Sequence, residues 1–217
     1  MIEGVTVDIG AEAVVVRSAR IMRALSCAVH LGGFQEARAA INVHVPKNHD
    51  CADAAGILDA FASRHAIAAP YVGLLTSAWT EHAVVAEQDA HGLRALAVAT
   101  VGLSNRVAAG REPVRPWTAG TINTIVVLDA DPEPAALVNA VITATEVKVL
   151  AFQEAGLRGA DGGPVSGTST DALVIAATRR GPRPRFGGPA SELGWTVAQV
   201  VGAALRDGIR QWQERNR

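Results

Sequence analysis

The segment GTINTIVVLDA, at residues 120–130, constrains the fold more than any other part of the sequence. A near-continuous run of Val and Ile is typical of a strand that is buried on both faces. A strand that alternates between apolar and polar residues, in contrast, buries one face only. Other elements of the chain must therefore cover this strand from both sides.

Several other short segments have the β-branched, alternating pattern of strands and are separated by glycines or charged residues. They lie at residues 5–9, 13–17, 25–30, 37–45, 71–76, 82–88, 93–101 and 171–178. The segments at 71–76, 82–88 and 93–101 follow one another closely, with a turn around Asp89, His91 and Gly92 between the last two. We expect these three to form a meander.

Three segments have helical spacing of apolar residues. The first spans residues 51–64 and follows Asp50, a residue type that caps helices. The second spans 134–154, beginning at Pro134 and stopped by Gly156. The third spans about 191–212 and carries an apolar stripe.

Many of the strands are joined too briefly for a right-handed crossover through a helix. We therefore predict an α+β fold with a mixed, largely antiparallel β-sheet and helices packed on its faces. The sequence has no repeat of fixed period and no long linker, so we expect one domain over residues 1–217. The loop at residues 106–120 is where a boundary between two halves would fall.

Composition excludes several classes of function. Hydrophobic residues make up 49% of the 217-residue chain and charged residues 19%, which excludes a disordered protein. The net charge of -1 and the 4% of aromatic residues argue against nucleic-acid binding. The acidic N-terminus does not resemble a signal peptide, and polar residues interrupt the most apolar window. We expect a cytoplasmic protein with no membrane span.

The two cysteines and their neighbours raise the question of a metal site. Cys27 and Cys51 have no CxxC spacing, so neither a disulfide framework nor a zinc finger is indicated. His44, His49 and Cys51 lie close together in the sequence but match no standard spacing of metal ligands. We expect no metal site.

A line of polar residues follows the second predicted helix. Asn139, Thr143, Glu146 and Gln153 lie within a narrow angular sector, whereas Lys148 points to nearly the opposite side. A carboxylate buried on such an apolar helix would be costly and is best tolerated where it has a function. A solvated stripe on a half-exposed helix explains the same pattern.

Two loops place polar residues at the ends of predicted strands. One carries Ser104 and Asn105 after the strand at 93–101. The other is rich in glycine and precedes the strand at 171–178, with the polar residues Ser166, Thr168, Ser169, Thr170 and Asp171. Such loops can present hydrogen-bond donors to a carbonyl oxygen or an anion, although ordinary turns use the same residue types.

An ordered series of motifs resembles the adenosylcobinamide amidohydrolase family, CbiZ. In chain order the motifs are LSCAVHLGG, INVHVP, VGLLTSA, AVATVGLSN, GTINTIVVLDA, TATEVKVLAFQE, SGTSTDALVIAA and FGGPASELG. They cover nearly the whole chain, and GTINTIVV, TATEVK and SGTSTD are the most specific. Cys27 stands where the family would have another small residue, and His44 and His49 are not typical of it.

The resemblance implies hydrolysis of the amide that joins the aminopropanol arm to the corrin ring of adenosylcobinamide. The product would be adenosylcobyric acid, used to salvage cobalamin precursors. The corrinoid substrate itself carries cobalt, so we expect no separate cofactor. Besides this substrate, the sequence leaves open whether the chain binds a second copy of itself.

Amide hydrolysis needs an activated nucleophile or water, donors for the oxyanion and an acid for the leaving amine. On this basis we assign catalytic roles to Glu146, as the group that activates water, and to Lys148 and Asp171. The residues expected to bind substrate are Ser104, Asn105, Thr121, Asn123, Thr145, Ser166, Thr168 and Thr170.

Two alternatives stay open. One is a salvage protein that binds corrinoids without catalysis. The other is a hydrolase whose nucleophile is Thr121, made N-terminal by self-cleavage after Gly120. Nothing else in the sequence marks a processing site, so we expect an uncleaved chain.

Overall fold

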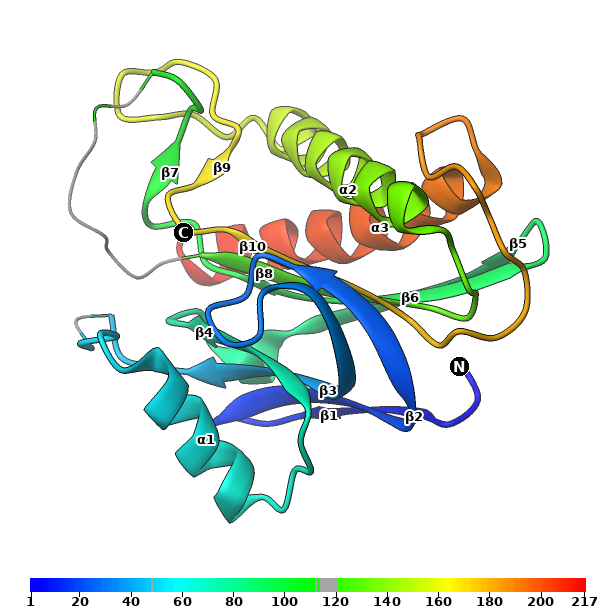
Figure 1. The fold of residues 1–217 in the computed structure, drawn as a ribbon. Helices are drawn as coiled ribbons and strands as arrows, with labels where there is room; N and C mark the ends of the chain where they lie inside the picture. Colours follow the sequence, from blue (N-terminus) through cyan, green and yellow to red (C-terminus); the bar gives the residue numbers. More distant parts are fainter. Residues whose placement is uncertain (48, 112, 114–120) are drawn as a thin grey trace.

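The computed structural model describes residues 1–47, 49–111, 113 and 121–217 (Figure 1). Part of the predicted loop at 106–120, including Gly120, lies outside the described residues. The elements in chain order are β1 (Val5–Ile9), β2 (Ala13–Ser26), β3 (Gly33–His44), α1 (Ala54–Arg64), β4 (Tyr71–Thr76), the 3₁₀ turn η1 (Thr80–His82), β5 (Val84–Ala90), β6 (Leu93–Val101), β7 (Arg106–Val107), β8 (Ile122–Leu128), α2 (Pro134–Glu154), β9 (Gly167–Thr168), β10 (Ala172–Ala177) and α3 (Glu192–Arg215).

The main sheet is mixed and largely antiparallel, which confirms the predicted α+β class. Its strands follow the order β4-β3-β2-β10-β8-β6-β5, and β1 pairs with β2 beside this path. The pairs β10–β8 and β3–β4 are parallel, and the other pairs of this sheet are antiparallel. β7 and β9 form a separate antiparallel pair.

The long strand β2 makes the sheet curl onto itself. Its register with β3 shifts between Arg17 and Met22, and the segment after the shift pairs with β10 as well. One face of the curled sheet encloses a core of small and β-branched side chains from β1–β4 on one side and from β6, β8 and β10 on the other. The two halves of the sheet therefore act as two packed layers.

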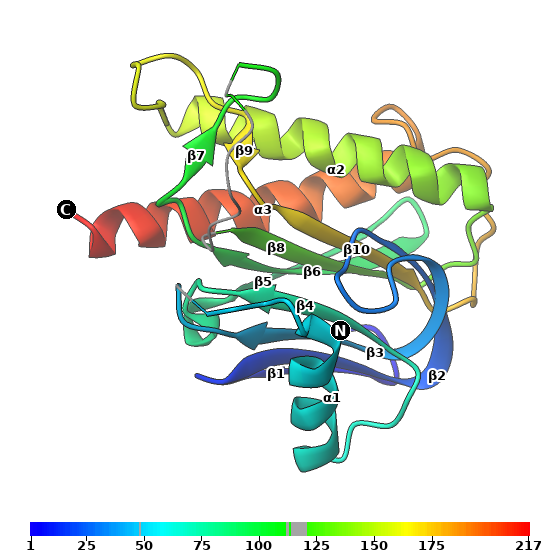
Figure 2. The same ribbon diagram turned by 60° about the vertical axis from the view of Figure 1, so that its left-hand side comes forward.

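Helices cover the two outer faces (Figure 2). α2 and α3 pack on β5, β6, β8 and β10, with Phe152, Leu193 and Val200 among the buried side chains. α1 packs through Leu58 and Phe61 on the outer face of β2 and β3. β8 is thus covered from both sides, as its sequence predicts, and each of its seven residues is buried.

Local sequence explains where the helices begin and end. α1 is capped by Asp53, whose side chain accepts a hydrogen bond from the Gly56 amide, and not by Asp50 as predicted. Asp50 instead caps the preceding turn by accepting from the Ala52 amide. α2 has the predicted bounds: Pro134 opens it, and Gly156 ends it with a positive φ of 65°.

The predicted meander of residues 71–76, 82–88 and 93–101 is wrong in one part. β5 and β6 pair as expected, but β4 pairs in parallel with β3. The reason is α1, which lies between β3 and β4 and supplies the crossover that a parallel pair needs. β4 therefore lies at the opposite end of the strand order from β5.

α2 is apolar on more than its packed face. Val138, Ile142 and Leu150 are exposed. Among the helices of the described residues, α2 is the one long and apolar enough by composition to cross a membrane, and 39% of that window is buried here. The same composition is found in helices that cover the core of a soluble protein.

Candidate active site

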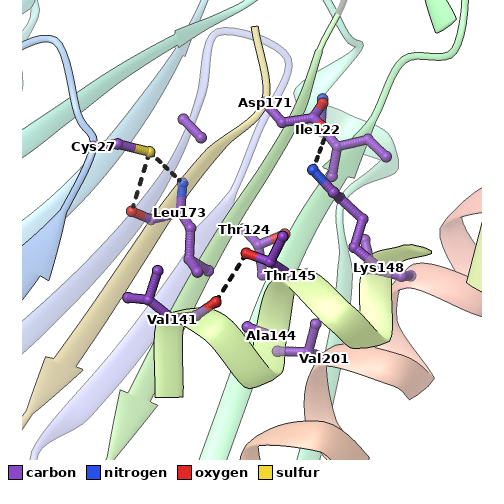
Figure 3. Close-up of a pocket in the computed structure, with 12 residues that line it drawn as sticks. Cys27, Ile122, Thr124, Val141, Ala144, Thr145, Lys148, Asp171, Leu173 and Val201 are labelled. Atoms are coloured by element: carbon purple, nitrogen blue, oxygen red, sulfur yellow. Dashed lines mark hydrogen bonds and ion pairs between the residues drawn. The ribbon is translucent and has the colours of Figure 1, made fainter. Parts of the chain in front are cut away.

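Asp171 connects three separate segments at the start of β10. Its carboxylate accepts a hydrogen bond from Lys148 Nζ of α2 at 2.5 Å, from the Ile122 amide of β8 at 3.1 Å and from the Thr168 amide of β9 at 3.0 Å. The Thr168 hydroxyl also donates to it. Figure 3 shows the Lys148 side chain extending upward from α2 to Asp171, next to Ile122. The specific motifs TATEVK, SGTSTD and GTINT thus meet at one carboxylate.

The ion pair at this junction is largely withdrawn from water. The Lys148 side chain is 19% exposed and the Asp171 side chain 12%. A charge in such a place is tolerated when it is paired and its remaining lone pairs are bonded, which the Ile122 and Thr168 donors provide. Loss of either charged partner would leave an uncompensated charge.

A second polar group lies inside the curled sheet and begins at Asn123, the residue after Ile122 in β8. The Asn123 amide donates to Asn42 Oδ1 at 2.8 Å and to the Leu75 carbonyl at 2.9 Å. Asn42 in turn donates to Thr100 at 3.0 Å. Asn42, Asn123 and Thr100 are buried to 1–2% exposure, and together they join β3, β4, β6 and β8. We call this the amide network.

Sequence reasoning found Asn123 but missed Asn42 and Thr100. The sequence does contain a feature that points to Asn42, because this polar residue interrupts the apolar run of AAINV in β3. A buried polar residue within such a strand is expected to be hydrogen-bonded. What the sequence does not show is the partner, because Asn42 and Asn123 are brought together by the curl of the sheet.

A cavity of about 570 Å³ lies at this end of the sheet. Its lining residues come from the end of β2, the start of α1, β4, and the starts of β8 and β10: Cys27, Val29, Asp50, Cys51, Ala52, Ala54, Leu74, Leu75, Asn123, Thr170, Asp171 and Ala172. We call it the central cavity. Its size is in the range of small-molecule sites, and its walls are mainly apolar with a few polar groups on one side.

Two groups in the central cavity have notable chemistry. The Thr170 hydroxyl oxygen is buried and has no hydrogen-bond partner within the described part of the chain. It is therefore available to a bound molecule. Burial, together with the neighbouring Asp50 carboxylate, raises the pKa of the Cys51 thiol above its usual value. Cys51 is accordingly a protonated thiol at neutral pH.

Two smaller cavities adjoin the same strand ends. The helix cavity, about 110 Å³, lies between α2, α3 and the sheet and includes Thr145, Lys148 and Asp171 (Figure 3). The side cavity, about 330 Å³, includes Ser104, Trp79 and Trp212. Sequence reasoning did not identify Ser77, whose buried hydroxyl lines the side cavity and lacks a partner among the described residues.

The two polar loops predicted from the sequence lie side by side. β7 pairs with β9, so that Arg106 lies opposite Thr168. Asn105 donates to Ser169 at 2.7 Å, and Ser166 accepts from the Ala109 amide at 2.9 Å. Ser166 and Asn105 thus hold the two loops together next to Thr168 and Asp171.

Glu146 is not brought to this group. Its side chain is exposed, and it lines none of the three cavities. Within its polar line, Thr143 is buried and donates to the Gly187 carbonyl at 2.9 Å, whereas Gln153 is exposed. The sheet packs against the side of α2 that carries Lys148, and the spacing of residues along a helix cannot reveal which side that is.

The histidines near Cys51 have other contacts. His44 Nδ1 lies 3.0 Å from the Ala78 carbonyl oxygen, and its ring stacks on Trp79. Cys51 donates weakly to the His49 carbonyl at 3.6 Å. Within residues 1–47, 49–111, 113 and 121–217, no three His, Cys, Asp or Glu residues are grouped so that they could hold a metal ion.

Comparison with known proteins gives the family. The adenosylcobinamide amidohydrolase family, CbiZ, matches residues 2–217. A protein of Methanosarcina mazei named adenosylcobinamide amidohydrolase is 29% identical over 187 residues, which is 82% of this chain and 86% of that protein. Among solved structures, the PH0078 protein of Pyrococcus horikoshii OT3 aligns over 94% of this chain and 82% of its own, with 11% identity and a TM-score of 0.48. Because the family match extends over almost the whole chain, this protein belongs to the adenosylcobinamide amidohydrolase family.

Proposed function

We propose that this protein hydrolyses the amide between the aminopropanol arm and the corrin ring of adenosylcobinamide, giving adenosylcobyric acid in the salvage of cobalamin precursors. The observation that carries the proposal is the junction at Asp171, where Lys148, Ile122 and Thr168 converge beside the central cavity. The family match supplies the substrate class.

The central cavity suits one flank of a large, mostly apolar corrinoid. Leu74, Leu75 and Val29 provide apolar wall, and the polar groups Asn123, Thr170 and Asp171 lie together on one side. An amide held against that side has its carbonyl oxygen near the Thr170 hydroxyl, which has no partner among the described residues and donates to the negative charge that develops on the oxygen. Lys148 contributes a positive charge close by.

The Lys148–Asp171 pair also positions the reacting groups. Asp171 fixes the backbone of Ile122 at the start of β8 and of Thr168 at the end of β9, so the side chains next to them keep one arrangement. Misplacement by about 1 Å can lower a rate by about 10²-fold, so such fixing has a kinetic effect. We infer roles in substrate binding for Ser104 in the side cavity and Thr145 in the helix cavity.

Mass spectrometry of the reaction mixture tests the proposal. The purified protein is incubated with adenosylcobinamide, and the mixture is searched for adenosylcobyric acid and free aminopropanol. Both products in equal amount are expected, and a sample without protein is the control. Tight binding of adenosylcobinamide without either product would favour a non-catalytic corrinoid-binding protein instead.

A further inference from the structure

The helix cavity and the central cavity share part of their lining. Cys27, Asp171 and Ala172 line both of them. Within the described part of the chain, the side cavity has no lining residue in common with either. A molecule that extends from the central cavity past Asp171 therefore enters the helix cavity. The Lys148–Asp171 pair lies where the two cavities meet.

The two connected cavities differ in size. The central cavity measures about 570 Å³ and the helix cavity about 110 Å³. One water takes up about 30 Å³ in the liquid, so the helix cavity has room for several water-sized groups but not for a macrocycle. The aminopropanol arm is small enough to enter it, and the corrin ring is not. Size alone therefore fixes which end of adenosylcobinamide faces which cavity.

Two threonines contribute hydroxyl groups to the helix cavity (Figure 3). Thr145 lies on α2, and its hydroxyl donates to the Val141 carbonyl at 2.8 Å. The hydroxyl oxygen of Thr145 keeps lone pairs with which it can accept a hydrogen bond. Thr124 reaches the same cavity from β8. A hydroxyl group on a bound molecule thus finds an acceptor in this cavity.

The spacing along α2 matches the spacing of the polar groups in aminopropanol. Lys148 and Thr145 both line the helix cavity and are three residues apart, a rise of about 4.5 Å along a helix. In aminopropanol the hydroxyl is separated from the nitrogen by a short two-carbon link. When the nitrogen lies beside the Lys148–Asp171 pair, the hydroxyl therefore comes within reach of Thr145.

The rest of the helix cavity is mainly apolar. Val141, Ala144 and Val201 line it from the helices, and Ile122 and Leu173 line it from the sheet. Such walls suit a small alkyl group. Aminopropanol carries a methyl group on the same carbon as its hydroxyl. The cavity thus combines an apolar wall for the methyl group with an acceptor for the hydroxyl.

We propose that the helix cavity binds the aminopropanol arm of the substrate and that Thr145 recognises the hydroxyl group of that arm. This inference rests on the proposed function and adds which part of the substrate lies on each side of Asp171. The corrin ring lies against the central cavity, and the amide to be cleaved lies at Asp171. Thr145 is a specificity residue, because it contacts a part of the substrate that the reaction leaves unchanged.

Two corrinoids test the hydroxyl contact. One is adenosylcobinamide, and the other is the same molecule with a propylamine arm, which lacks the hydroxyl. With the wild type, we expect kcat/KM to be about 3–10-fold lower for the propylamine analogue, the usual effect of one lost hydrogen bond. Thr145→Val removes the hydroxyl and nearly keeps the side-chain volume. It is expected to lower kcat/KM for adenosylcobinamide by a similar factor and to leave that for the analogue unchanged.

Two further variants are the controls. Thr145→Ser keeps a hydroxyl and is expected to keep the preference of the wild type for adenosylcobinamide. Ile142→Val changes an exposed residue of α2 that lines none of the three cavities, and it is expected to behave like the wild type. Circular dichroism checks that each variant is folded. If Thr145→Val loses the same factor on both corrinoids, or loses nothing on either, the proposal is overturned.

Val141 tests the apolar part of the cavity. A third corrinoid carries 1-amino-2-butanol in place of aminopropanol, so its arm is larger by one methylene group. Val141→Ala enlarges the cavity, and one methylene group in an apolar pocket changes kcat/KM by about 10-fold or more. We expect the ratio of kcat/KM for the larger arm to that for adenosylcobinamide to rise at least about 3-fold in this variant. An unchanged ratio would contradict the placement of the arm in the helix cavity.

Failure of the proposed function has a different signature. If the wild type releases no product from any of the three corrinoids, the amidohydrolase activity is refuted, and equilibrium dialysis then gives the dissociation constants of adenosylcobinamide and its propylamine analogue. Tighter binding of adenosylcobinamide that is lost in Thr145→Val supports the position of the arm. Equal binding of both corrinoids by the wild type overturns it. If product forms and Thr145→Val keeps the wild-type preference, the inference fails and the proposed function stands.

Discussion

The two ends of β8 and β10 both carry charged pairs, yet they differ in what surrounds those pairs. At the far end, where both strands finish, Arg180 pairs with Asp129 at 2.9 Å, Arg183 with Asp131 at 3.2 Å and Arg185 with Glu133 at 3.7 Å. At the near end, where both strands start, Lys148 pairs with Asp171. Among the described residues, the far end therefore has more ion pairs than the near end.

Burial and cavities separate the two ends. The Arg183 and Arg185 side chains are more than 70% exposed, so their pairs are screened by water and contribute little to stability. The near end combines a pair withdrawn from water, the amide network, the central cavity and a Thr170 hydroxyl that has no partner in the part of the chain that the structure describes. A site is therefore marked by polar groups held in place beside open space, and charge pairing alone does not identify one.

The strongest test of this difference between the two ends is to remove one carboxylate charge at each end. Asp171→Asn takes away the partner of Lys148 and weakens the hold on Ile122 and Thr168, so we expect turnover to fall by about 10²-fold or more. Asp129→Asn removes one of the two carboxylates that pair with Arg180 at the far end, the other being that of Glu3, and we expect turnover within about twofold of the wild type. Initial rates with adenosylcobinamide measure both.

The folded state of both variants is checked by circular dichroism, and Lys148→Met serves as a second variant of the near pair. Equal losses of turnover in Asp171→Asn and Asp129→Asn would mean that the near end has no special role. Normal turnover in both Asp171→Asn and Lys148→Met would remove the pair from the mechanism.

The two ends should also differ, by a smaller amount, in how much one buried hydrogen-bonding side chain contributes to the free energy of unfolding. Asn42→Ala leaves the Asn123 amide and the Thr100 hydroxyl with one partner fewer inside the core, so we expect a loss of about 1–3 kcal/mol in the free energy of unfolding. Thr178→Val removes one bond to Asp129, whose carboxylate keeps Arg180 as a partner. Its expected loss is about 0.5–1.5 kcal/mol. Urea unfolding measures the free energy of unfolding of both variants. A larger loss in Thr178→Val than in Asn42→Ala would contradict this prediction.

The smallest effect is expected on the exposed side of α2. Glu146→Gln changes an exposed side chain that lines none of the three cavities, so turnover should stay within about twofold and the melting temperature should not change. Steady-state rates and a melting curve measure this. A loss of about 10²-fold would restore Glu146 as the group that activates water.

Sequence patterns predict local features of this molecule well and long-range ones poorly. The bounds of α2 follow from Pro134 and Gly156, and the double burial of β8 follows from its Val and Ile run. The parallel pairing of β4 with β3 and the meeting of Asn42 with Asn123 depend on the curl of the sheet, which no local pattern encodes. The polar line along α2 points to Glu146, but helical spacing cannot distinguish the packed side of a helix from the solvated one.

The double covering of β8 and β10 has a consequence for how this end of the protein fluctuates. Both strands have a neighbour along each edge and a hydrophobic layer on each face, so their amide hydrogens reach water only when the whole domain opens. Hydrogen exchange should therefore be slowest in these strands. The candidate site begins where they begin, which anchors its backbone to the part of the molecule that opens least often.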